Sequence, residues 1–168
     1  PGLAAAAADP DAPSVTAVWR RKGIGRHLNY GLLLCSAQAI NLYTIGFVII
    51  DRMPAGSLAA QQMIGVAMTV GAITALLAQW GLVRLLSLAP PTMMRVGAGL
   101  AGAGNVAAML DGDVRAAVAG FALASFGYGL ARPGFSAAAS LAGSAREQVG
   151  IASAITLIAG ASITLPPI

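Results

Sequence analysis

The sequence predicts an all-α membrane protein, a bundle of about five transmembrane helices. Its 168 residues are 57% apolar and only 10% charged, whereas a soluble domain carries about 25% charged residues. The charged residues also divide the chain into long uncharged runs, and a helix needs about 20 mainly apolar residues to cross a bilayer. Folded in water, this composition would expose large apolar patches that associate. Lipid is therefore the simpler solvent for the chain.

The predicted helices follow the uncharged runs in order. Three long runs contain 23, 31 and 21 residues and cover 28–50, 53–83 and 148–168. Two further runs, 96–110 and 116–131, become long enough when Arg95 lies at the interface and Arg132 lies within a span. We therefore predict spans near 28–50, 57–83, 93–110, 114–141 and 147–168. Barrel strands would alternate polar and apolar residues, and these runs, rich in Ala, Leu and Gly, do not.

The segments between the predicted spans have the composition of turns. Asp, Pro and Gly occur in 51–57, Asp-Gly-Asp forms 111–113, and two prolines interrupt 88–92. Residues 144–148 are a polar loop. Residues 1–27 are predicted to be a linker, Ala- and Pro-rich at first and then basic, and residues 28–168 the helix bundle. The linker is not a signal peptide, because its basic residues follow the Ala-rich stretch.

Basic residues predict the orientation of the bundle. With the N-terminus in the cytoplasm, seven Lys and Arg residues lie on the inner side and two on the outer side. The inner residues are Arg20, Arg21, Lys22, Arg26, Arg84, Arg95 and Arg146, and the outer residues are Arg52 and Arg115. The acids Asp51, Asp111 and Asp113 all fall outside. This bias is the one found in multi-pass proteins with a cytoplasmic N-terminus.

Several function classes are excluded by the composition. The net charge is +4 and the pI about 10.0, but the basic residues do not interleave with aromatic ones, so no nucleic-acid partner is expected. Cys35 is the single cysteine, which leaves no disulfide within the chain and no two-Cys metal site. Residues 134–138 lack the second glycine of a nucleophile elbow, and His27 is the single histidine. We expect no enzyme, cofactor or metal.

Two amides in the first span are candidate cavity residues. Gln38 and Asn41 are three residues apart, so they are predicted to share a helix face. An amide facing lipid is costly, so this face must meet another helix or a watery cavity. Hydrogen bonding between helices, which is common in membrane bundles, and a role in binding substrate both remain open.

The fourth span carries a polar stripe with a charge in it. Its members are spaced three or four residues apart, namely Ser125, Tyr128, Arg132, Ser136 and Ser140. Arg132 is the single charge well inside a span, and such residues are functional-site hypotheses by default. It lies about 27 Å from the outer start of the helix. Snorkelling to the inner interface, or bonding to carbonyls freed near Pro133, remains an alternative to substrate contact.

In the third span, Gly97, Gly99, Gly102 and Gly104 predict close helix packing.

The order of these parts resembles part of a known family. Gly127-Tyr128-Gly129-Leu130-Ala131-Arg132-Pro133-Gly134-Phe135 and the Ala-Arg-Glu-Gln-Val-Gly loop at 145–150 are the main motifs. They follow a basic linker, the helix with Gln38 and Asn41, and a helix that ends in Gln-Trp-Gly-Leu-Val-Arg at 79–84. This order resembles the C-terminal half of a major facilitator superfamily (MFS) transporter of the bacterial drug-efflux kind. The likeness covers nearly the whole chain.

The resemblance implies a function and its partners. Members of this superfamily have twelve helices in two halves around a central cavity and work by alternating access. The chain would supply five of them, and its partners would be the lipid bilayer, the missing N-terminal half and last helix, and a small-molecule substrate. The implied function is secondary active transport, with efflux of small organic molecules or drugs by an antiporter of the bacterial inner membrane. Gln38, Asn41, Tyr128 and Arg132 are the candidate cavity residues. A non-transporting membrane protein, an assembly factor or degenerate pseudo-transporter, is the alternative.

Overall fold

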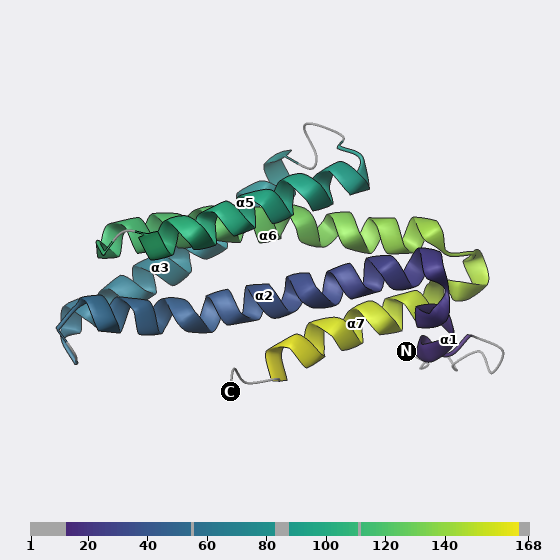
Figure 1. The fold of residues 1–168 in the computed structure, drawn as a ribbon, viewed down its shortest axis with the longest axis horizontal. Coiled ribbons are helices and arrows are strands. Elements are labelled where there is room, and N and C mark those ends of the chain that lie inside the picture. The colour runs from purple at the N-terminus through teal and green to yellow at the C-terminus, as the bar shows by residue number, and fades with distance from the viewer. Residues whose placement is uncertain (1–12, 55, 83–87, 111, 165–168) are drawn as a thin grey trace, which may run out of the picture.

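A computed structural model describes residues 13–54, 56–82, 88–110 and 112–164, and these residues form an all-α bundle (Figure 1). The elements are α1 (Val15–Arg20), α2 (Lys22–Arg52), α3 (Leu58–Leu77), a π-helical turn (Ala78–Leu82), α5 (Pro90–Leu110), α6 (Val114–Ala142), a 3-10 turn (Ala145–Glu147) and α7 (Gln148–Thr164). The predicted all-α class is confirmed, and a helix covers most of each of the five predicted ranges.

Three helical segments in the described part of the chain are long and apolar enough to cross a membrane. They are Lys22–Arg52, Leu58–Trp80 and Val114–Ala142. The other two predicted spans correspond to α5, with 21 residues, and α7, with 17. Glycines, Arg95 and Asn105 lower the hydropathy of α5, and α7 is about 26 Å long, slightly less than the roughly 30 Å of hydrocarbon.

The helix bounds differ from the predicted ones mainly at the N-terminus. Part of the predicted linker is helical, because the Ser14 side chain caps α1 and α2 already begins at Lys22. Helix α5 begins at Pro90, three residues earlier than predicted, since proline is tolerated in the first turn of a helix. Residues 1–12 of the linker, residues 83 and 165–168 of two predicted spans, and Arg84 and Asp111 lie outside the described residues.

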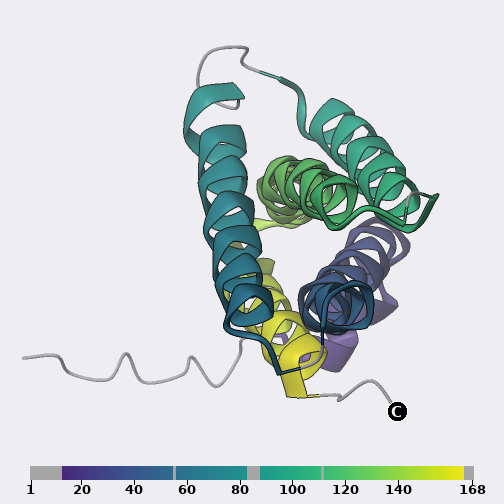
Figure 2. The same ribbon diagram turned by 90° about the vertical axis from the view of Figure 1, so that its left-hand side faces the viewer.

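Helix α6 holds the bundle together. It contacts α5 most extensively, then α2 and α3, and Figure 2 shows these three helices around it. Helix α7 packs mainly on α2, and the short α1 lies against both α2 and α7. The bundle therefore has two unlike sides, one where α5 and α6 lie together and one where α2, α6 and α7 meet.

The α6–α7 turn lies at one end of the bundle, and the α2–α3 and α5–α6 turns lie at the other (Figure 1). The start of α2, the end of α6 and the start of α7 share one end, which we name the basic end because Arg20, Arg21, Lys22, Arg26 and Arg146 belong to these segments. At the opposite end, the Arg52 guanidinium donates to the carbonyls of Ala108 and Asp113 at 3.0 and 3.2 Å. There Gly56 has a φ of 73°, and this left-handed conformation closes the predicted turn before Ser57 caps α3.

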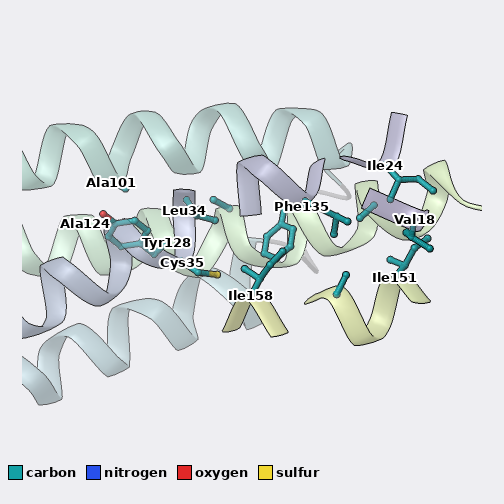
Figure 3. Close-up of a cluster of buried hydrophobic side chains, with 14 residues drawn as sticks. Val18, Ile24, Leu34, Cys35, Ala101, Ala124, Tyr128, Phe135, Ile151 and Ile158 are labelled. Carbon is teal, nitrogen blue, oxygen red and sulfur yellow. The ribbon is translucent and has the colours of Figure 1, made fainter. Parts of the chain in front are cut away.

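The largest core cluster joins α1, α2, α6 and α7 and includes Ala101 of α5 (Figure 3). Val18, Ile24 and Ile151 gather at one end of it, with Phe135 and Ile158 further along. Phe135 is only 1% exposed, and its ring lies directly over Gly31, where any side chain would collide with the ring. The aromatic ring thus fills the space that the glycine leaves between α2 and α6.

Helices α5 and α6 meet along small residues, which we name the glycine seam. It consists of Gly97, Ala101, Gly104 and Ala108 of α5 and Gly120, Ala124, Gly127 and Ala131 of α6. A Cβ at Gly97 would lie 2.6 Å from the Gly127 carbonyl oxygen, so the two backbones are in contact. The predicted close packing is present at Gly97 and Gly104, whereas Gly99 and Gly102 face open space.

Candidate functional site

A polar pocket lies where α2, α6 and α7 meet, and it contains two of the predicted site residues. Its volume is about 190 Å³. It is lined by Cys35, Gln38, Ala39, Leu42, Tyr43, Arg132, Ala159, Ser162 and Ile163, and we name it the Arg132 pocket. The pocket lies near the middle of the long helices, because Gln38 is about 2 Å from the midpoint of α2 and Arg132 about 6 Å from that of α6.

The Arg132 side chain is exposed and lacks a protein partner in the described ranges. No ion pair or hydrogen bond joins its guanidinium to another described residue, although its backbone carbonyl accepts from Ser136 Oγ at 3.2 Å. The bond to carbonyls near Pro133, one of the two structural roles considered above, is therefore absent from this part of the chain. The Cys35 thiol lines the same pocket as the guanidinium.

The other polar groups of the pocket differ in whether they are already bonded. Ser162 Oγ donates to the Ala159 carbonyl at 3.1 Å, and Tyr43 Oη makes a long, weak bond of 3.4 Å to the Ile163 carbonyl. The Gln38 amide has no hydrogen-bond partner among the described residues. The donors available to a ligand are thus the Arg132 guanidinium and the Gln38 amide.

Asn41 lies in a second pocket, on the other side of α2. This pocket has a volume of about 250 Å³, is lined mostly by apolar side chains of α2 and α5, and includes Asn105. Gln38 and Asn41 were predicted to share a face and to act in one cavity, but they line different pockets. Residues three apart on a helix differ by about 60° in direction. Because α2 is flanked by α7 on one side and α5 on the other, that difference separates the two amides.

Tyr128 is a packing residue between α5 and α6. It is 2% exposed, and its hydroxyl accepts a hydrogen bond of 3.0 Å from Asn105 Nδ2. It borders a third pocket, of about 340 Å³, with Tyr30, whose hydroxyl donates to the Met94 carbonyl at 2.7 Å. The predicted polar stripe of α6 is therefore divided, since Tyr128 faces α5 and Arg132 faces α2 and α7.

Asn105 was not among the predicted site residues, although it touches two of the pockets. The signal that singled out Asn41, an amide within an apolar span, applies equally to Asn105. Its importance comes from being opposite Asn41 and Tyr128, which depends on how α5 is placed against α2 and α6. A single sequence does not contain that placement.

A compact polar network orders the basic end. Glu147 accepts from the Ser144 amide at 2.8 Å and from its hydroxyl at 2.7 Å, and it pairs with Arg21 at 2.6 Å. These Ser144 hydrogen bonds, followed by the Arg21 charge, hold the pKa of the Glu147 carboxyl below its usual range. Ser144 and Glu147 form a capping box, whose S-x-x-E pattern is visible in the sequence. This network ties the α6–α7 turn to the start of α2.

Within the described ranges, no group of three or more His, Cys, Asp and Glu side chains is placed to hold a metal ion. Comparisons of the chain with protein-family models, with curated proteins and with solved structures find no match. A functional assignment therefore depends on the geometry of the chain and on its motifs.

Proposed function

We propose that this chain is part of a secondary active transporter of the MFS type, which moves small organic molecules across the bacterial inner membrane by alternating access. The observation that carries the proposal is that Arg132, beside Gln38 at mid-length of α2 and α6, has no side-chain partner among the described residues. An arginine at this depth in lipid is costly, so it must face water, a ligand or another protein segment. A polar, ligand-accessible pocket at mid-depth is what transport by alternating access requires.

The distribution of packing also favours a transporter. The glycine seam holds α5 and α6 together without space between them, whereas exposed apolar side chains such as Leu33, Phe47 and Leu76 cover α2 and α3. In the proposal these apolar surfaces meet lipid or the other half of the transporter. A closely packed half-bundle is suited to moving as one body against its counterpart.

Transport assays with the full-length protein that contains this chain test the proposal. Efflux of a panel of labelled organic solutes is measured in membrane vesicles, with Arg132→Gln as the variant and Arg115→Gln as the control. Arg115 is exposed at the start of α6, far from the pocket. We expect Arg132→Gln to abolish efflux at unchanged protein abundance and Arg115→Gln to leave it intact. A folded wild-type protein that moves no solute would favour the alternative, a non-transporting membrane protein.

Topology gives a second test of the same proposal. Single cysteines are introduced in a Cys35→Ala background at Gly112, at the opposite end, and at Arg146, at the basic end. Membrane-impermeant reagents should label position 112 from outside the cell and position 146 from the cytoplasmic side, because the basic end is predicted to be cytoplasmic. The reverse pattern would contradict the proposed orientation.

The position of the carboxylates bears on energy coupling. A proton-coupled carrier usually needs a titrating group in the pathway. The carboxylates among the described residues are Asp51, Asp113 and Glu147, and all three lie at the ends of helices. If the protein is an antiporter, its proton carrier therefore belongs to another part of it. Changing each of the three to its amide should leave proton-driven efflux coupled; loss of coupling in any one of them would overturn this.

A further inference from the structure

The Arg132 pocket combines one positive charge with an otherwise neutral lining. Its remaining polar groups are the Gln38 amide, the Tyr43 and Ser162 hydroxyls and the Cys35 thiol, and no Asp or Glu lines it. Along α6, Asp113 is about 28 Å from Arg132, and Glu147 lies beyond the other end of the helix, paired with Arg21. The charge is therefore uncompensated within the described residues.

The Arg132 side chain is exposed at the protein surface, so its distance from bulk water comes from the depth in the bilayer that the proposed function gives it. That depth makes the charge selective. Coulomb interactions strengthen as the dielectric constant falls, so an anion at mid-depth is attracted much more strongly than the same anion at a wet surface. The planar guanidinium offers paired N–H donors that match the two oxygens of a carboxylate, and the Gln38 amide lies beside it as a further donor. A cation in this position would meet like charge.

The apolar part of the lining and the pocket volume indicate what kind of molecule bears the anionic group. Ala39, Leu42, Ala159 and Ile163 give the pocket an apolar wall. The volume of about 190 Å³ is smaller than the roughly 300–1,000 Å³ of a site for a drug-sized ligand. The pocket therefore has room for the charged end of an amphiphile and a short apolar part, with the remainder extending out between the helices.

We propose that the Arg132 pocket binds the carboxylate end of an amphiphilic organic anion, with the Arg132 guanidinium and the Gln38 amide as its donors. This inference rests on the proposed transport function and gives its substrate class. The ligand is a soluble amphiphile and not the head group of an anionic phospholipid, because phospholipid head groups lie at the membrane surface and the pocket lies at mid-length of the helices.

Equilibrium binding tests the inference separately from transport. The full-length protein is placed in nanodiscs of zwitterionic lipid, and the fluorescence of 11-(dansylamino)undecanoate is titrated beside that of its methyl ester, which has the same body without the charge. The carboxylate should bind at least about 10-fold more tightly than the ester, since hydrogen bonds to charged groups contribute about 1.5–3 kcal/mol. Adding phosphatidylglycerol to the nanodiscs should not compete.

Three variants and one control assign the donors. Arg132→Gln should weaken carboxylate binding about 10- to 100-fold without changing ester binding, and Gln38→Leu should weaken it about 3- to 10-fold. Arg132→Lys should retain part of the affinity, because it keeps the charge and loses the paired donors. Arg95→Gln, an exposed arginine of α5 outside the pocket, should change nothing. Size-exclusion profiles and thermal denaturation establish that each variant is folded.

Different results would contradict the anion site and the proposed transport function. Equal affinity of the wild-type protein for acid and ester would overturn the anion site, as happens if a carboxylate elsewhere in the protein neutralises Arg132. Parallel loss of acid and ester binding in a folded Arg132→Gln variant would also overturn it, as would displacement of the acid by phosphatidylglycerol. Selective binding of the acid by a protein that transports no solute would instead support the anion site and contradict the proposed transport function.

Discussion

The two sides of α6 use the same helix in opposite ways. Toward α5, its glycines and alanines bring two backbones into contact along the glycine seam. Toward α2 and α7, the same helix carries larger side chains, the buried Phe135 ring over Gly31 and the Arg132 side chain that lines a pocket. The comparison teaches that a single helix can combine close backbone packing on one side with a polar pocket on the other.

Removal of the Phe135 ring should have the largest effect on stability. The ring is buried between α2 and α6 over Gly31, and Phe→Ala in a core costs about 3–5 kcal/mol through lost contacts and the cavity left behind. Reversible unfolding in mixed micelles, followed by circular dichroism, measures the loss. Leu33→Ala, at a side chain that is 73% exposed on the same helix as Gly31, is the control. Equal losses for both variants would mean that this side has no specific core.

The glycine seam should be the next most sensitive feature, and two neighbouring glycines test it. At Gly97 an added methyl group would lie 2.6 Å from the Gly127 carbonyl oxygen, whereas at Gly99 it meets nothing within 4 Å. We expect Gly97→Ala to lower the free energy of unfolding by about 1–3 kcal/mol through overpacking. Gly99→Ala should be neutral or slightly stabilising, because alanine favours helix. Indistinguishable unfolding curves for these two variants would show that close packing along the glycine seam does not contribute to stability.

A smaller effect is expected where α3 meets α6. Thr74 Oγ1 is 3.0 Å from two carbonyl acceptors, Gly71 within α3 and Ala122 across the interface. Thr69 Oγ1 bonds only within α3, to Gly65. Hydrogen bonds between membrane helices contribute about 0.6 kcal/mol on average. Thr74→Val should therefore destabilise the bundle by about that amount more than Thr69→Val does. A larger loss for Thr69→Val would show that this contact does not contribute.

The smallest effect, and the one that depends on pH, belongs to Glu147. Its pKa is lowered in the folded protein, so the ionised form is the one that folding favours. The contribution to stability is therefore complete above the ordinary carboxyl range and disappears as the pH falls through the lowered pKa. Since the Arg21 side chain is 64% exposed, solvent screens the ion pair.

Unfolding of the wild-type protein and of Glu147→Gln over a pH series measures this contribution. The stability difference between the two should be present at neutral pH and vanish in acid. A difference that stays constant with pH would assign the effect to the loss of packing alone. High salt should reduce the part that comes from Arg21 and leave the Ser144 hydrogen bonds, which are short-range, largely unchanged.

The sequence by itself determined the helices and their approximate bounds. Apolar runs of 20 or more residues leave the backbone no partners but its own, which makes helices the expected result in lipid. Two helix starts were not recognised in the sequence: the prolines at 90 and 91 were predicted to interrupt the chain and 144–148 to be a polar loop, whereas α5 begins at Pro90 and Ser144 and Glu147 form a capping box. The sequence also singled out Arg132 and Gln38, since a polar group in an apolar run is conspicuous without any structure.

Only the tertiary structure decided which of these side chains meet. Gln38 and Asn41 were predicted to share one helix face, and Tyr128 and Arg132 to share one polar stripe, yet each pair is divided between different pockets. The four glycines of α5 were likewise indistinguishable until two of them met α6. The physical reason is that helix periodicity gives directions around one axis, whereas contacts depend on where the neighbouring axes lie. Those positions come from packing over the whole bundle, between residues as distant along the chain as Tyr43 and Ile163, which are 120 residues apart.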